Sequence, residues 1–154
     1  MGKDDSNGHR EFQFRVDDED ILQFIRFGST DNLLASLKGS TDITDSNYYC
    51  LSATFDSGVG SVIYVNGSSE DSDIITTANN NTDEVLLIGA RDISLMDNYH
   101  DDVIDEVRIS DTARSAAWIK ATYNSLWDTL LTYGDEETSE EEAVDNAIMF
   151  GMNF

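Results

Sequence analysis

The sequence predicts an all-β fold, an antiparallel β-sandwich with one short helix near the C-terminus. Short stretches in the first two-thirds of the chain alternate apolar and polar residues, which is typical of half-buried strands. Turn-forming residues separate these stretches, and helical periodicity appears only after residue 110. The 154 residues suit one domain, and a hydrophobic content of 40% is enough to form a core.

Seven strands are expected from this alternation, over residues 11–17, 21–27, 33–37, 48–55, 61–65, 85–88 and 102–110. Only a charged turn separates the first two, so they predict a hairpin, with Phe12, Phe14 and Val16 on one face. The glycines of residues 56–60 favour a second hairpin, and Asn66-Gly67 is a strong turn signal. Residues 68–84 are polar and are expected to form a long loop.

The C-terminal third has a different pattern. Ser115 can cap a short helix through Tyr123, with Trp118, Ile119 and Tyr123 facing the sheet. Six acidic residues in positions 135–142 predict a solvated tail. The expected divisions are a sandwich domain over residues 1–134, an acidic linker over 135–146 and an apolar segment over 147–154.

The charge balance excludes two classes of partner. There are 31 Asp and Glu residues against 9 Lys and Arg, which gives a net charge of −22. Nine scattered cations cannot form the basic patch that nucleic acid requires, and an anionic membrane surface would repel the chain. No run of 18 apolar residues is present, so membrane insertion is not expected. Such acidity favours a saline, halophilic source, where counterions screen the surface.

The single cysteine and the start of the chain carry less information. Cys50 has no possible disulfide partner within the chain and is expected to be a buried, small hydrophobic residue. The first five residues are polar, so no secretory signal peptide is visible.

Five segments stand out in the rest of the chain: residues 48–56 (YYCLSATFD), 62–67 (VIYVNG), 86–89 (LLIG), 104–109 (IDEVRI) and 113–119 (ARSAAWI) followed by Tyr123-Asn124. In order and spacing they resemble the LamG-like jelly-roll domains of the concanavalin A-like lectin/glucanase group. The first of them resembles the family's W-H-H-V-A-x-T-Y-D strand, with Tyr48 in place of the usual Trp. The change at Tyr48 lies on a packing strand and indicates altered core packing.

The resemblance implies a jelly-roll sandwich that acts as a non-catalytic recognition module, extracellular, at a cell surface or on a virion, and binds glycan or a surface protein through its loops. The alternative is a structural subunit of a virion or surface assembly. Family members usually carry further strands before the one that begins at Phe12. The chain is therefore expected to be a short version, a fragment, or one member of a homo- or hetero-oligomer in which a partner strand completes the sandwich. The apolar end at 147–154 favours assembly.

Candidate ligand-binding residues lie on the predicted loops. Sugar binding uses exposed aromatic rings and planar polar side chains, and Tyr99 and the Asn79, Asn80, Asn81 run provide both. Tyr64 is instead expected to pack in the sheet.

A structural Ca²⁺ is the one cofactor considered. Loops rich in carboxylate oxygens suit this ion. The candidate ligands are Asp97, Asp101 and Asp102, with Asp56 in a neighbouring hairpin turn. LamG-like domains often hold one Ca²⁺ at the rim of the sandwich. The alternative is that these residues are solvated acids in a chain that has many.

Catalysis is not expected. Glucanases of this fold carry Glu-x-Asp-x-Glu on one strand, and this triplet is absent from the sequence. Asp105 and Glu106 are adjacent and therefore point to opposite faces of a strand. His9 and His100 have no neighbouring nucleophile and are expected at the surface.

Overall fold

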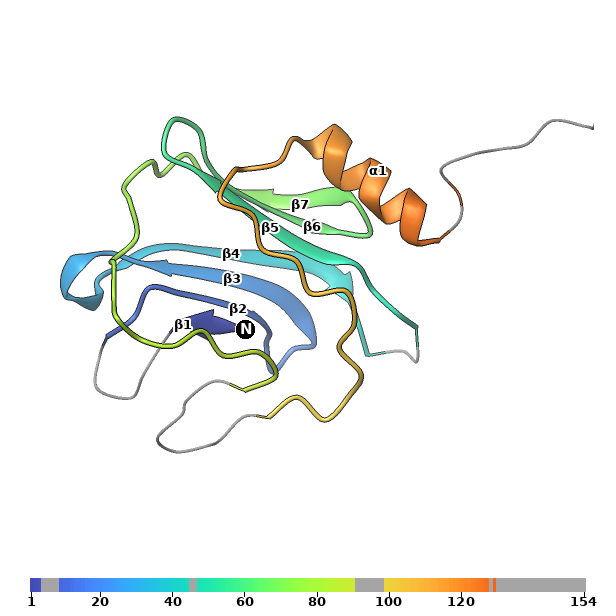
Figure 1. Cartoon of the computed structure of the whole chain (residues 1–154), viewed down its shortest axis with the longest axis horizontal. Helices are drawn as coiled ribbons and strands as arrows, with labels where there is room; N and C mark the ends of the chain where they lie inside the picture. Colours follow the sequence, from blue (N-terminus) through green and yellow to red (C-terminus); the bar gives the residue numbers. More distant parts are fainter. Residues whose placement is uncertain (4–8, 45–46, 91–98, 128, 130–154) are drawn as a thin grey trace, which may run out of the picture.

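The computed structural model describes residues 1–3, 9–44, 47–90, 99–127 and 129. Two antiparallel sheets lie face to face, and one helix lies on the outer side of the second sheet (Figure 1). The first sheet has the order β1-β2-β3-β4, with bounds Gly2–Lys3, Phe12–Val16, Ile21–Phe27 and Leu33–Asp42. The second has the order β5-β6-β7, with bounds Leu51–Asp56, Gly60–Val65 and Ser68–Ser72. Helix α1 spans Ala116–Leu126, and a 3-10 turn spans Ser29–Asp31.

The described residues confirm the predicted β-sandwich with one short helix. β2, β3, β5 and β6 lie where the alternation places them, and the β2–β3 hairpin pairs Phe14 with Phe24. β4 is longer than predicted, since it continues to Asp42. β7 departs from the loop predicted over residues 68–84. It has no large apolar side chain, and it forms because the Asn66-Gly67 turn returns the chain along β6.

Two predicted strands are wrong. Residues 85–88 form only one antiparallel bridge, in which Gly2 and Leu87 exchange two backbone hydrogen bonds of 3.0 Å. Residues 102–110 form no strand with the described part of the chain, and all of them are exposed. Alternation predicts that a segment can pair, whereas its tertiary neighbours decide whether it does.

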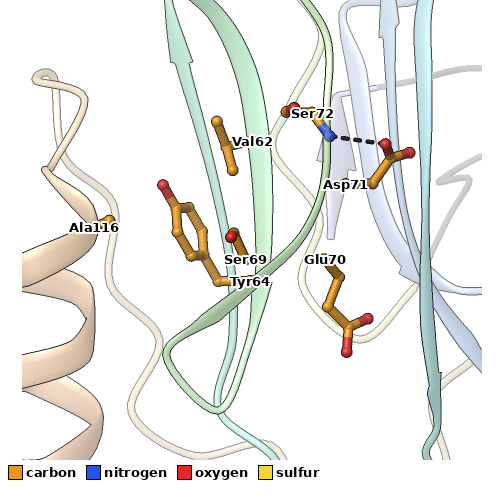
Figure 2. Close-up of a pocket in the computed structure, with 7 residues that line it drawn as sticks. All are labelled: Val62, Tyr64, Ser69, Glu70, Asp71, Ser72 and Ala116. Atoms are coloured by element: carbon orange, nitrogen blue, oxygen red, sulfur yellow. Dashed lines mark hydrogen bonds between the residues drawn. The ribbon is translucent and has the colours of Figure 1, made fainter.

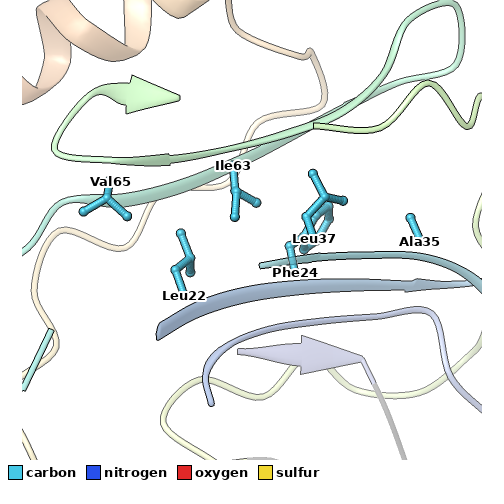
Figure 3. Close-up of a cluster of buried hydrophobic side chains, with 6 residues drawn as sticks. All are labelled: Leu22, Phe24, Ala35, Leu37, Ile63 and Val65. Carbon is cyan, nitrogen blue, oxygen red and sulfur yellow. The ribbon is translucent and has the colours of Figure 1, made fainter. Parts of the chain in front are cut away.

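The hydrophobic core lies between the two sheets (Figure 3). Six buried side chains from β3, β4 and β6 form its centre: Leu22, Phe24, Ala35, Leu37, Ile63 and Val65. Burial of one large aliphatic side chain of this kind contributes roughly 1.5–3 kcal/mol. Phe12 and Phe14 extend the core, with ring centroids 6.4 and 6.3 Å from that of Phe24. Val16 shares their face as predicted, since it lies opposite Leu22, but it ends the strand and is 37% exposed.

Carboxylates of β7 cover the outer edge of β4. Glu70 accepts hydrogen bonds from the N–H groups of Ser40 at 2.8 Å and Thr41 at 3.3 Å, and also from the Thr41 hydroxyl. Asp71 accepts one from the Lys38 N–H at 3.0 Å. Uncovered strand edges promote association between chains, so these two side chains protect one side of the sandwich.

Helix α1 begins and docks as the sequence indicates, with one exception. Ser115 Oγ accepts a hydrogen bond from the Trp118 N–H at 3.2 Å, and Ile119 is buried. The helix lies against the β6–β7 turn at Gly67, where φ is 71° and an added Cβ would lie 3.0 Å from the Lys120 Cα. Trp118 is 45% exposed, so the prediction that it faces the sheet is wrong. The side of α1 that contacts the sheet is therefore narrower than the apolar side predicted from the sequence.

One carboxylate holds the β2–β3 turn. Asp17 Oδ1 accepts hydrogen bonds from the N–H groups of Glu19 at 3.0 Å and Ile21 at 3.1 Å. Its Oδ2 lies 2.9 Å from the Lys38 ammonium. The hydrogen bond from Lys38 holds the pKa of Asp17 below its usual value. Hydrogen bonds to Glu19 and Asp17 raise the pKa of Lys38.

We expect Asp17→Asn to lower the free energy of unfolding at pH 7 and to lose this effect in acid, as the pH falls below the unfolded pKa and then through the lowered folded pKa of Asp17. A carboxyl whose pKa is lowered in the folded state stabilises the fold above its unfolded pKa of about 3.9. This contribution is lost as the pH falls through the folded pKa. Asparagine keeps an acceptor for the two turn N–H groups, so urea unfolding at pH 7 and in acid measures the Lys38 pair. The exposed control Asp18→Asn should change stability by less than about 0.5 kcal/mol.

Candidate functional site

Arg26 is the largest fully buried side chain among the described residues. It extends from β3 into the space between the sheets, in register with Phe12 and Ala35. Its guanidinium carbon lies 3.5 Å from the centre of the Phe55 ring. Burial lowers the pKa of Arg26, and the Asp73 carboxylate, 4.0 Å from Nη1, opposes this effect. A guanidinium stays charged in proteins, so one end of the core contains a positive charge.

Four hydrogen bonds hold the Arg26 guanidinium in place. Nε donates to Asn79 Oδ1 at 2.7 Å. Nη1 donates to the Ser61 hydroxyl at 2.7 Å and to the Ile75 carbonyl at 3.0 Å. Nη2 donates to the Thr77 carbonyl. Three of these acceptors belong to the loop after β7, so a side chain of the first sheet holds the loop that leaves the second.

The 73–80 loop crosses from one sheet to the other and is anchored at both ends. At its start, the Asp73 N–H donates to the Ser61 carbonyl at 2.9 Å. At its end, the Asn80 N–H donates to the Phe27 carbonyl at 2.7 Å. Gly60, with a φ of 115°, packs against the loop so closely that an added Cβ would lie 2.1 Å from the Asp73 carbonyl oxygen. The loop is therefore tied down at its ends and, through Arg26, in its middle.

The structure gives the three candidate asparagines different surroundings. Asn79 is half-buried, and its side-chain oxygen is bound by Arg26. Asn80 is also half-buried and is bonded through its backbone, whereas Asn81 is exposed. Tyr99 is 57% exposed in a separate segment. No hydrogen bond of the described residues joins Tyr99 to the asparagines, so the structure does not bring the two halves of the predicted site together.

The predicted calcium ligands do not form a site within the described ranges. Asp97 lies outside them. Asp56 ends β5, where its Oδ1 accepts a hydrogen bond from the Gly58 N–H at 2.7 Å, while Asp101 and Asp102 are exposed. No group of three His, Cys, Asp or Glu side chains that could hold a metal ion occurs in the part of the chain that the structure describes. Calcium binding stays a prediction.

A shallow pocket of about 340 Å³ lies on the outer face of β6 and β7, beside the start of α1 (Figure 2). Its lining residues are Val62, Tyr64, Ser69, Glu70, Asp71, Ser72 and Ala116. The Tyr64 side chain extends toward the helix and is 5% exposed, so it packs on the sheet as predicted and offers no open face to a sugar. Glu70 and Asp71 already bind the β4 backbone. The anchored loop is therefore the better candidate site.

The remaining thiol, carboxylate and imidazole side chains considered from the sequence show no arrangement that indicates catalysis in the described part of the chain. Cys50 is half-buried, and burial raises the pKa of its thiol, as fits a small hydrophobic residue. Asp105 Oδ1 accepts the Glu106 N–H at 2.8 Å. His9 and His100 are exposed, as predicted.

Arg26 was not among the candidate residues, although the alternation of β3 indicates that its side chain faces inward. Leu22 and Phe24 occupy inward positions of the strand, and Arg26 follows at the same spacing of two. An inward arginine at the end of such a strand indicates buried acceptors nearby.

Two antiparallel sheets with loops at their ends define the chain as a lectin-like β-sandwich. Residues 1–142 match a laminin G family profile described as the Concanavalin A-like lectin/glucanases superfamily, and the chain belongs to this superfamily. The jelly-roll resemblance read from the sequence is thereby confirmed.

Comparison with solved structures found a similar chain, the crystal structure of an S-layer domain-containing protein from Clostridium thermocellum. The identity is 18% and the TM-score 0.48. The similarity covers 77% of this chain and 59% of that one, so this chain spans about three-fifths of that structure. Comparison with curated proteins gave no match. No helix within the described residues is long and apolar enough to cross a membrane.

We expect Arg26→Met to lower the free energy of unfolding by about 3–5 kcal/mol, because it leaves the buried Ser61 hydroxyl and the partly buried Asn79 and Thr77 oxygens without their donor. Arg26→Lys should recover only part of this loss, since one ammonium cannot reach acceptors that a planar guanidinium spans. Urea unfolding at pH 7 measures both.

The matched control is Arg15→Met, which removes an exposed arginine of β2 bonded to Gln23. A change below about 0.5 kcal/mol is expected there. Equal losses at the two positions would mean that Arg26 contributes no more than a surface cation.

Proposed function

We propose that the chain is a non-catalytic recognition module, located outside the cell or on a virion, that binds a glycan or a surface protein through loops at one end of its sandwich. Membership in a superfamily named for lectins supports a glycan ligand. The net charge of −22 supports an environment with abundant counterions.

The anchoring of the 73–80 loop by Arg26 is the observation that carries this proposal. A loop that is ordered before binding loses less conformational entropy when the ligand arrives, which favours affinity. Binding residues are commonly found on loops held by a rigid scaffold. Asn81 follows the anchored segment directly and is exposed, so its amide can donate and accept hydrogen bonds with hydroxyl groups of a ligand.

Two apolar side chains extend the same end of the sandwich. Val59 in the β5–β6 hairpin is 66% exposed, and Ile74 in the anchored loop is 88% exposed. Both lie next to Gly60. Exposed aliphatic side chains gathered beside polar ones support a protein ligand as the alternative to a glycan.

Asp105 and Glu106 have no catalytic role in this proposal. Asp105 is engaged with the neighbouring backbone N–H, and Glu106 forms an ion pair with Arg108 at 2.7 Å. Glycoside hydrolysis would need two carboxylates that face one bound sugar.

We expect Asn81→Ala to weaken glycan binding roughly tenfold without changing the melting temperature, because it removes one or two hydrogen bonds from an exposed side chain. A glycan array identifies the ligand, and calorimetric titration measures the affinity, with and without EDTA. Loss of binding in EDTA would support the calcium prediction.

Ser125→Ala, on the exposed side of α1, is the control and should bind as the parent does. If no glycan binds at about 0.1 mM protein, the glycan form of the proposal is wrong. Unchanged affinity in Asn81→Ala would place the site away from the anchored loop.

A further inference from the structure

Most outer strands of the two sheets have a covered edge. The carboxylates of Glu70 and Asp71 cover β4 and bring β7 against it. Leu87 pairs with Gly2 and so covers β1. The outer strands of the second sheet are β5 and β7. Within the described residues β7 meets β4 through its side chains, whereas β5 pairs only with β6.

An apolar segment of the chain, in the part that the structure describes, has no strand pairing. We name residues 103–109 the closing segment. It passes β5 in Figure 1. Burial raises the pKa of Cys50, the residue before β5, and the nearby Arg108 guanidinium partly opposes that effect. Arg108 of the segment therefore lies near the start of β5.

The closing segment has the properties of a strand that lacks a neighbour. Val103 is 69% exposed and Ile109 66%, and no backbone–backbone hydrogen bond joins the segment to other described residues. Glu106 has a φ of 53°, a left-handed conformation that costs free energy for a residue with a Cβ. Extended pairing would remove this cost and would satisfy the exposed backbone groups.

The charges of the closing segment are complementary to those of a second copy. Glu106 and Arg108 flank Val107. If two copies pair antiparallel with Val107 opposite Val107, each Glu106 lies directly opposite Arg108 of the other copy. The two-fold symmetry forms this ion pair twice. Opposite charges in facing positions stabilise antiparallel strands, and like charges destabilise them.

We propose that two copies of this chain associate by antiparallel pairing of their closing segments, centred on Val107. The inference does not depend on the recognition function, because the anchored loop is not part of the paired surface. Two chains of charge −22 repel each other at long range. Pairing should therefore strengthen once salt screens that repulsion, while contact pairs at the interface are screened less.

Sedimentation velocity from about 1 to 200 μM protein tests the proposal, in ~20 mM and ~0.3 M KCl, where the Debye length is roughly 20 and 6 Å. The expected result is a dimer that is stronger at the higher salt. At that salt, Arg108→Glu and Glu106→Arg should each weaken dimerisation at least tenfold, because each places two like-charge pairs at the interface. The double exchange, Glu106→Arg with Arg108→Glu, should restore the dissociation constant to within about threefold.

Both side chains are more than half exposed, so the variants are expected to fold, and their melting curves verify this. Hydrogen exchange gives an independent readout: the amides of residues 103–109 should become protected as the protein concentration rises. A monomer at both salt concentrations would overturn the proposal. The proposal would also be overturned if the charge reversals left the dissociation constant of the dimer unchanged. The contact would then lie elsewhere, for example in the apolar residues 147–154.

Discussion

The buried guanidinium of Arg26 joins three parts of the molecule that would otherwise meet only through apolar contact. It belongs to the first sheet, contacts Phe55 and Ser61 of the second, and binds the carbonyls of the 73–80 loop. A positive charge without partners in this position would be strongly unfavourable, so the loop must close whenever the sheets pack. The polar loop is in this sense part of the core, and its order is coupled to the stability of the sandwich.

Acidic side chains do more in this chain than keep its surface hydrated. Asp17, Glu70 and Asp71 each accept hydrogen bonds from backbone N–H groups, at a turn or along a strand edge. Such groups have no alternative acceptor where a sheet ends. A share of the 31 acidic residues is thus structural, because these side chains bind backbone groups of the sandwich.

The sequence predicted the fold well where local chemistry decides the structure. Alternation identified β2, β3, β5 and β6, and Ser115 marked the start of α1. The sequence-based prediction was wrong where residues far apart in the chain determine the local structure. β7 carries no apolar alternation and depends on the preceding turn and the β4 edge, while residues 102–110 alternate clearly and lack a partner strand. For the candidate site, the asparagine run was found, but the difference between Asn79 and Asn81 depends on Arg26, which is 53 residues away from Asn79 in the chain.

The position of the single thiol makes the open edge of the second sheet observable by chemistry. Cys50 is half-buried at the entrance to β5, and its N–H is bonded to Asn66 at 3.0 Å. While the strand is in place, the thiol is shielded and mostly protonated, so alkylating reagents should react with it slowly. When the strand end opens, the thiol regains the reactivity of a solvated cysteine. The labelling rate of the unmodified protein therefore reports how often this edge of the sandwich detaches, without any introduced reporter group.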